Sequence, residues 1–200
     1  MELTAMKKTL EQLGYGVHVF GTAQEASDWL NAEIDGKTVG IGGSMTLYEM
    51  GMAESLGRHN EVFCHFAAPE KEKLKLRQQA AETEVYLSSV NGLAETGEII
   101  NIDGTGNRVA STIYGHKTVY LVIGRNKIAP TYEEALHRAR NIAGPKNAQR
   151  LGVRTPCAVR GDRCYNCKSP ERICRALVVF WEAVKSCRTE IVLVDEDLGY

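Results

Sequence analysis

The apolar and polar positions of this chain alternate between the spacing of helices and the spacing of strands. Stretches with apolar residues every three or four positions predict helices that bury one face. Short runs rich in β-branched and aromatic residues separate these stretches and predict strands. Helices are expected over residues 2–14, from 22 onward, 46–56, 69–81 and 132–142, and strands over 15–20, 38–41, 62–65, 85–90, 98–102, 118–123, 174–181 and 190–194.

Capping residues support several of these boundaries. Gly14 follows the first helical pattern and is a plausible C-terminal cap. Thr22 with Glu25 three positions later has the form of a capping box at the start of the second helix. Pro130-Thr131 gives a start signal for the helix over 132–142.

Strands that alternate with helices predict an α/β fold with a mostly parallel sheet and flanking helices. The chain shows no internal repeat and no low-complexity linker. We therefore expect a single α/β domain over residues 1–200. Its composition changes near Gly152, where a small cysteine-rich segment over 152–175 begins, and a β-rich tail follows it.

Composition narrows the classes of protein to consider. The chain has 200 residues, of which 44% are hydrophobic and 24% charged, which is ordinary for a soluble globular protein. A formal net charge of -1 gives no reason to expect nucleic acid as a partner. The apolar run over 176–181 is too short to span a membrane, and residues 1–8 lack a signal-peptide core. A cytoplasmic protein is expected.

Glycine-rich polar clusters follow four of the predicted strands, over residues 42–44, 91–92, 101–108 and 124–127. Ligands of open α/β sheets bind beyond the carboxyl ends of the strands. Four such clusters predict one polar crevice for a small anionic metabolite. Its candidate ligand-binding residues are Gly42, Gly43, Ser44, Asn91, Asn101, Gly104, Gly106, Asn107, Arg108, Asn126 and Lys127.

Two of these clusters have simpler interpretations. The segment over 101–108 combines glycines with Asp103 and Arg108, whose planar fork suits an anion, but Asp-Gly is also a common hairpin turn. The segment over 42–46 lies between a strand and a helix and could bind an anion on backbone N–H groups, or Ser44 could simply cap the helix. Neither segment is a Walker A loop or a dinucleotide fingerprint.

Two carboxylates in or near the polar cluster over residues 101–108 are candidates for catalysis. Asp103 and Glu95 could act as a base or nucleophile at this crevice. Glu95 could equally be a solvated loop residue. His65 and His116 stand alone in the sequence, and a structural role is the expectation for both.

Four of the six cysteines occur within eighteen residues, at Cys157, Cys164, Cys167 and Cys174. This cluster contains one C-x-x-C step, which can place two thiolates on one metal. Zinc or an iron–sulfur cluster is therefore a candidate cofactor, with a metal-free Cys164–Cys167 redox pair as the alternative. The other two cysteines, Cys64 and Cys187, are expected to be small core residues.

The ordered set of motifs resembles the LUD-domain family of lactate-utilisation proteins, formerly DUF162. The motifs that carry this resemblance cover residues 42–51, 95–97, 101–110, 124–127, 140–148, 155–157, 164–174 and 194–200. The resemblance implies a fold akin to the NagB, RpiA and CoA-transferase proteins. It also implies a bacterial cytosolic role in the oxidation of L-lactate to pyruvate.

Two functions follow from these expectations. The chain could be an enzyme, or a subunit of one, that binds a small anionic metabolite in the crevice. Alternatively, it could be a non-catalytic accessory subunit whose cysteine segment binds a metal or cluster. Larger relatives carry iron–sulfur clusters and work in a multi-protein complex, so the resemblance implies iron–sulfur oxidoreductase subunits as partners. Assembly into a homo-oligomer stays open, and no membrane partner is expected.

Overall fold

The computed structural model describes residues 3–200, so Glu2, the expected start of the first helix, lies outside the described residues. The strands are β1 (Gly16–Phe20), β2 (Thr38–Ile41), β3 (Glu61–Cys64), β4 (Val85–Ser88), β5 (Gly92–Ala94), β6 (Ile99–Asp103), β7 (Thr118–Gly124), β8 (Ile128–Ala129), β9 (Ala176–Phe180) and β10 (Arg188–Val194). The α-helices are α1 (Leu3–Gln12), α2 (Ala23–Glu33), α3 (Met45–Glu49), α4 (Met52–Leu56), α5 (Glu70–Ala80), α6 (Asn107–Ile113), α7 (Tyr132–Arg138), α8 (Gly144–Arg150) and α9 (Pro156–Arg160).

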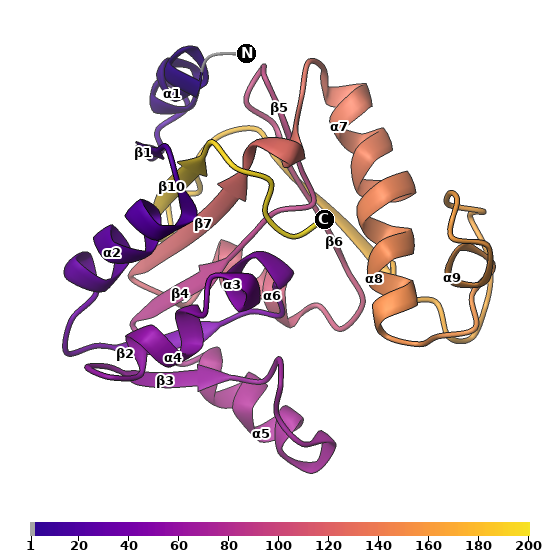
Figure 1. Cartoon of the computed structure of the whole chain (residues 1–200), viewed down its shortest axis with the longest axis horizontal. Helices are drawn as coiled ribbons and strands as arrows, with labels where there is room; N and C mark the ends of the chain where they lie inside the picture. The colour runs from indigo at the N-terminus through magenta and orange to yellow at the C-terminus, as the bar shows by residue number, and fades with distance from the viewer. Residues whose placement is uncertain (1–2) are drawn as a thin grey trace.

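A six-stranded sheet with the order β1-β10-β7-β4-β2-β3 forms the body of the fold, and every neighbouring pair in it is parallel (Figure 1). The expected α/β fold with a mostly parallel sheet is therefore confirmed. Alternate side chains of β7 enter opposite cores: Val119 and Leu121 pack with α1, whereas Tyr120 and Val122 pack with α2, α3 and α4. Burial on both faces explains why this strand is almost continuously apolar.

A second sheet of four strands has the order β8-β5-β6-β9. Strand β6 pairs antiparallel with both β5 and β9. The strand expected over 98–102 is present as β6, but it lies in this second sheet and not in the parallel one. Strand β5 has only three residues and begins with a glycine, so its sequence has the character of a turn.

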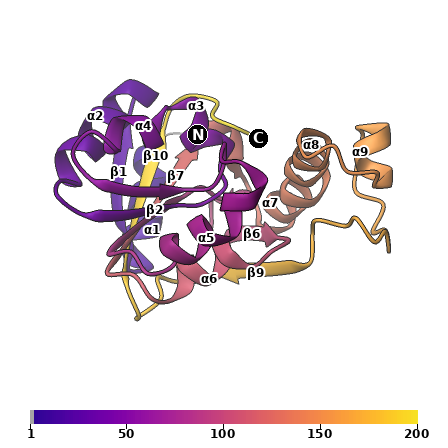
Figure 2. The same ribbon diagram turned by 90° about the horizontal axis from the view of Figure 1, so that it is seen from below.

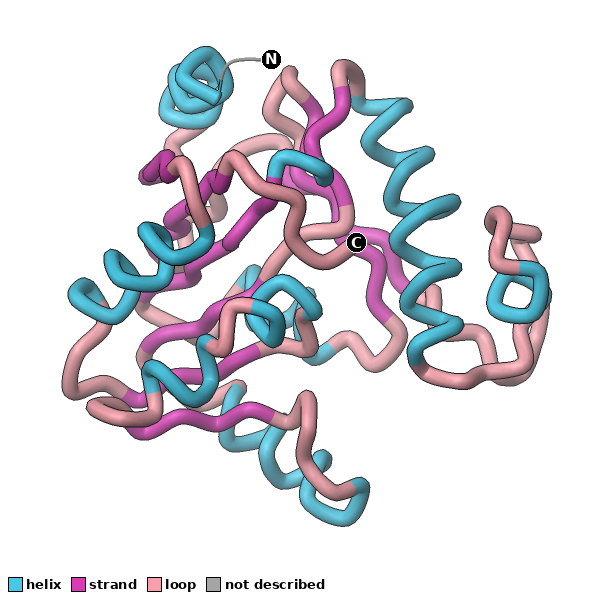
Figure 3. Tube along the Cα trace, in the orientation of Figure 1, coloured by secondary structure: helices cyan, strands magenta, loops and turns pink. Residues whose placement is uncertain are grey.

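Two predicted helices differ from the structure in length. The helix expected over 46–56 is divided into α3 and α4 because Gly51 adopts a left-handed conformation with φ 64°. The helix expected over 132–142 continues through a π-helical turn over Ala139–Ala143 into α8 (Figure 3). Pro145 lacks the N–H that a regular helix needs in this turn, which explains the wider π geometry.

The cysteine-rich segment lies beyond α8, at one side of the molecule (Figure 2). It contains the short helix α9, and residues 161–175 have no regular secondary structure apart from turns. The side chain of Asn141 ties this segment to the π-helical turn by accepting a hydrogen bond from the Cys164 N–H at 3.1 Å. Within residues 3–200, no helix is long and apolar enough to cross a membrane.

Candidate functional site

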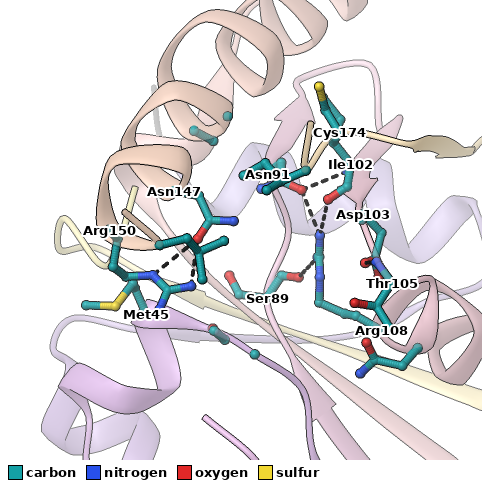
Figure 4. Close-up of a pocket in the computed structure, with 18 of the residues that line it drawn as sticks. Met45, Ser89, Asn91, Ile102, Asp103, Thr105, Arg108, Asn147, Arg150 and Cys174 are labelled. Carbon is teal, nitrogen blue, oxygen red and sulfur yellow. Dashed lines mark hydrogen bonds between the residues drawn. The ribbon is translucent and has the colours of Figure 1, made fainter. Parts of the chain in front are cut away.

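A cavity of about 390 Å³ lies where β2, β3, β4 and β7 end (Figure 4). The residues after these strands form its floor, while α5, α8 and the cysteine-rich segment contribute to its walls. Eight of the predicted catalytic and ligand-binding residues line it: Gly43, Ser44, Asn91, Asp103, Gly104, Asn107, Arg108 and Lys127. Five others do not: Gly42, Glu95, Asn101, Gly106 and Asn126.

Arg108 lines the cavity, but its terminal nitrogens are occupied by the protein. One donates to the carbonyl of Ser89 at 2.9 Å and to the amide oxygen of Asn101. The other donates to Asn91 Oδ1 at 2.8 Å and to the Ile102 carbonyl at 2.7 Å (Figure 4). The expectation of a fork free to hold an anion is therefore corrected. Arg108 joins strand β6 to the residues after β4.

Asp103 also has a structural role. One carboxylate oxygen accepts from the N–H groups of Thr105 and Gly106 at 3.1 and 3.0 Å, and the other accepts from Val109 at 3.1 Å. Burial raises the pKa of Asp103, but hydrogen bonds from backbone N–H groups and the charge of Arg108 together lower it by more, so the net shift is downward. A carboxylate held ionised in this way is a weak base, and its hydrogen bonds order the loop before α6.

Three predicted residues lie outside the cavity wall. Glu95 follows β5 at the end opposite Asn91, so it is not placed to act as a base in this cavity. Gly42 allows close packing, since a Cβ there would lie 2.8 Å from the Tyr86 hydroxyl. Gly106 caps α6 with φ 90°, a conformation that favours glycine.

Two predicted asparagines bind other parts of the protein. Asn101 is fully buried, accepts a hydrogen bond from Arg108, and has no partner for its Nδ2 within residues 3–200. Asn126 accepts from the Leu198 N–H at 3.2 Å and donates to the Gly199 carbonyl at 3.3 Å. It therefore anchors the C-terminal tail beside the cavity.

Ser44 acts as a helix cap. Its hydroxyl accepts a hydrogen bond from the Leu47 N–H at 3.3 Å, at the start of α3. This helix has only five residues, so its macrodipole adds little to anion binding. The capping interpretation accounts for the side chain, although both Gly43 and Ser44 border the cavity.

Lys127 is a titratable group that the site affects strongly. Its side chain is buried, and Nζ donates to Thr46 Oγ1 at 2.7 Å and to Ser89 Oγ at 2.8 Å. Burial, followed by the nearby cations Arg138 and Arg108, lowers the pKa of this amine to about 7. An ammonium has three donors, so one remains for a bound group. Lys127 can therefore gain or lose a proton near neutral pH.

The cavity is strongly cationic, a feature that the sequence patterns did not predict. Its lining includes one carboxylate, from Asp103, and seven basic side chains: Lys73, Arg77, Arg108, Lys127, Arg150, Arg172 and Arg175. The Nε of Arg77 is buried and has no hydrogen-bond partner within residues 3–200. Lys73 and Arg77 lie four positions apart on α5, so they share one helix face.

His65 lies in the cavity wall, which corrects the expectation of a purely structural histidine. Burial, with Arg77 and Lys73 next, lowers its pKa to about 4. The imidazole is therefore neutral at pH 7. Its Nδ1 is buried and has no partner in the part of the chain that the structure describes. Such a ring can donate or accept one hydrogen bond with a bound group.

The four clustered cysteines line a separate cavity of about 270 Å³. This cysteine cavity adjoins the cationic one, since Arg172, Cys174 and Arg175 line both. Cys64 and Cys187 lie elsewhere and pack at the edges of the two main cores, as expected.

Comparison with family models places the chain in one family. A family model of the LUD domain matches residues 3–194. The crystal structure of a DUF162 family protein from Deinococcus radiodurans is similar over 96% of this chain and 95% of that chain, with a TM-score of 0.54 and 13% identity. A ribose 5-phosphate isomerase from Plasmodium falciparum matches 54% of this chain and 52% of that chain, with a TM-score of 0.36 and 13% identity. No curated protein shows significant similarity.

Proposed function

This chain belongs to the LUD domain family of lactate-utilisation proteins, and we propose on that premise that it binds a small, multiply charged anion in the cationic cavity. The ligand class is a metabolite that carries a phosphate, or at least two carboxylates. A volume of about 390 Å³ is in the range of small-metabolite sites.

The charge of the lining carries this proposal. Cations that face a cavity repel one another, and a bound anion removes that cost. Several of the seven basic groups are already bonded within the protein: Arg108 by β6 and its neighbours, and Arg150 by Asn147 and Tyr200. Arg77 is different, because its buried Nε has no hydrogen-bond partner among the described residues. A phosphate or carboxylate would satisfy it through a charge-assisted hydrogen bond.

Lys127 gives the bound anion a reactive neighbour. Two of its donors hold Thr46 and Ser89, and the third is available to an acceptor on the ligand. Binding of an anion would favour the ammonium form and raise the pKa of Lys127 from about 7. The side chain is thereby suited to donate or receive a proton at a bound metabolite, a role that we assign to Lys127 in place of Glu95 and Asp103.

We expect Arg77→Gln to weaken the binding of 3-phosphoglycerate, a probe with a phosphate and a carboxylate, by about tenfold. Lys75→Gln is the matched control, because it removes a positive charge from the same helix at an exposed position outside the cavity. Its effect should stay below about twofold. Isothermal titration calorimetry at fixed salt, with L-lactate as the singly charged comparator, measures each affinity.

Two results would contradict the proposal. If Arg77→Gln and Lys75→Gln lose the same affinity for 3-phosphoglycerate, the effect would come from general surface charge and not from the cavity. Tighter binding of L-lactate than of 3-phosphoglycerate would show that the site selects a single carboxylate and not a multiply charged anion.

A further inference from the structure

The cysteine cavity brings together side chains from three parts of the segment. Cys157 lies in α9, Cys164 and Cys167 lie in the following loop, and Cys174 lies just before β9. All six cysteines of the chain are free thiols. Convergence of these four on one cavity, while Cys64 and Cys187 lie elsewhere, indicates a shared ligand and not merely a cysteine-rich composition.

The arrangement does not suit a single metal ion. Within residues 3–200, no three His, Cys, Asp or Glu side chains are grouped closely enough to hold one. A tetrahedral zinc site needs sulfurs at about 2.3 Å from one common point. Four thiols spread around a cavity of about 270 Å³ instead leave room for a larger group. An iron–sulfur cluster is larger than a single ion and is bound by the same number of cysteines.

The surroundings of the sulfurs also fit a cluster. Arg172 Nε donates to Cys174 Sγ at 3.2 Å, and the Asn166 N–H donates to Cys164 Sγ at 3.4 Å. Arg140 lies 3.9 Å from Cys164 Sγ. Hydrogen bonds to the sulfurs tune iron–sulfur clusters, and nearby guanidinium groups offset the negative charge of four thiolates.

The remaining wall of the cavity is mostly apolar, with Ile102, Leu136, Pro145, Ile173 and Leu177 among its lining residues. An apolar wall limits the access of water to a bound cluster. The segment itself is poor in core residues, and none of its side chains belongs to the three hydrophobic cores. A bound cluster would therefore supply ordering that apolar burial does not.

We propose that Cys157, Cys164, Cys167 and Cys174 bind a [4Fe–4S] cluster next to the cationic cavity. The cluster shares the wall formed by Arg172, Cys174 and Arg175 with the anion site. This inference stands independently of the anion-binding proposal, because it rests on different residues and is measured without any metabolite.

The full chain purified without oxygen tests the proposal. We expect about four iron and about four acid-labile sulfide per chain, with broad visible absorption and an electron paramagnetic resonance signal after reduction by dithionite. Cys164→Ala should lower the iron content at least fivefold. Cys187→Ala is the matched control and should keep it, because Cys187 lies outside the cavity.

Far-UV circular dichroism of each variant checks folding, and retained signal is expected because the cores do not use the segment. Zinc in place of iron at one ion per chain would overturn the proposal, and so would a Cys164–Cys167 disulfide without metal. Equal iron loss in Cys164→Ala and Cys187→Ala would overturn it as well. If the wild-type chain holds iron but does not bind 3-phosphoglycerate, the result would count only against the anion site.

Discussion

Replacement of Arg108 by methionine is expected to lower the free energy of unfolding by about 3 kcal/mol. The guanidinium donates to Ser89, Asn91, Asn101 and Ile102, and methionine fills similar space with none of these donors. Asn101 is fully buried and cannot exchange its lost partner for bulk water. An unsatisfied buried acceptor costs about 1–3 kcal/mol, so the loss of the bond to Asn101 is expected to be the largest part of the destabilisation by Arg108→Met.

Urea denaturation at fixed pH measures the effect, with Arg125→Met as the control. Arg125 pairs with Asp195 on the surface, where both side chains are 57% exposed, so its loss should change stability by less than about 1 kcal/mol. Arg108→Lys should fall between the wild type and Arg108→Met, because an ammonium cannot reproduce the planar fork. Equal stability of Arg108→Met and the wild type would show that the contacts of Arg108 are not important for folding.

Much of the six-stranded sheet was predictable because its information is local. Strand β7 is a long apolar run and β10 ends in four apolar residues. The capping box of α2 is present as expected, with the Thr22 side chain accepting from Glu25 N. The second sheet was harder to foresee. Strand β5 is short, and its pairing with β6 and β8, like that of β6 with β9, is set by contacts that the local pattern does not encode.

The position of the site was also predictable, but the roles of its residues were less so. Glycine clusters after β2, β4 and β7 indicated the sheet edge at which the cavity lies. The hydrogen-bond partners of Arg108 lie 6 to 19 positions away in the chain. The sequence of the loop alone therefore does not show that its guanidinium is bonded to other protein groups.

Helix α5 shows which signal could have revealed the cationic wall. Its charged sequence resembles a solvated helix, and most of it is exposed. The i, i+4 spacing of Lys73 and Arg77 nevertheless gave both residues one face. The pattern did not show what this helix face lies against, because the cavity forms only when β3, α5 and α8 are brought together.

Lys127 illustrates a property that only the fold creates. In an extended chain a lysine at this position has the ordinary pKa of 10.5. Burial next to Arg138 and Arg108 lowers the pKa to about 7 in the native state. Because the pKa of Lys127 differs between the native and the unfolded state, the free energy of unfolding must depend on pH.

We therefore expect the stability of the wild type, relative to Lys127→Met, to rise by about 3 kcal/mol between pH 7 and 9.5. Above pH 7 the native state loses the Lys127 proton, whereas the unfolded chain keeps it until about pH 10.5. The unfolded state thus binds more protons across this window, and stability must increase with pH. Below pH 7 both states hold the proton, so the difference should become constant.

Urea denaturation of both proteins at half-unit pH steps measures this difference, and other titrating groups cancel because the two proteins share them. Lys117→Met, at an exposed position outside the cavity, provides a control whose difference from the wild type should change little with pH. Parallel pH profiles of the wild type and Lys127→Met would mean that Lys127 keeps its proton when buried. It would then be a fixed cation for the ligand and could not exchange protons with it.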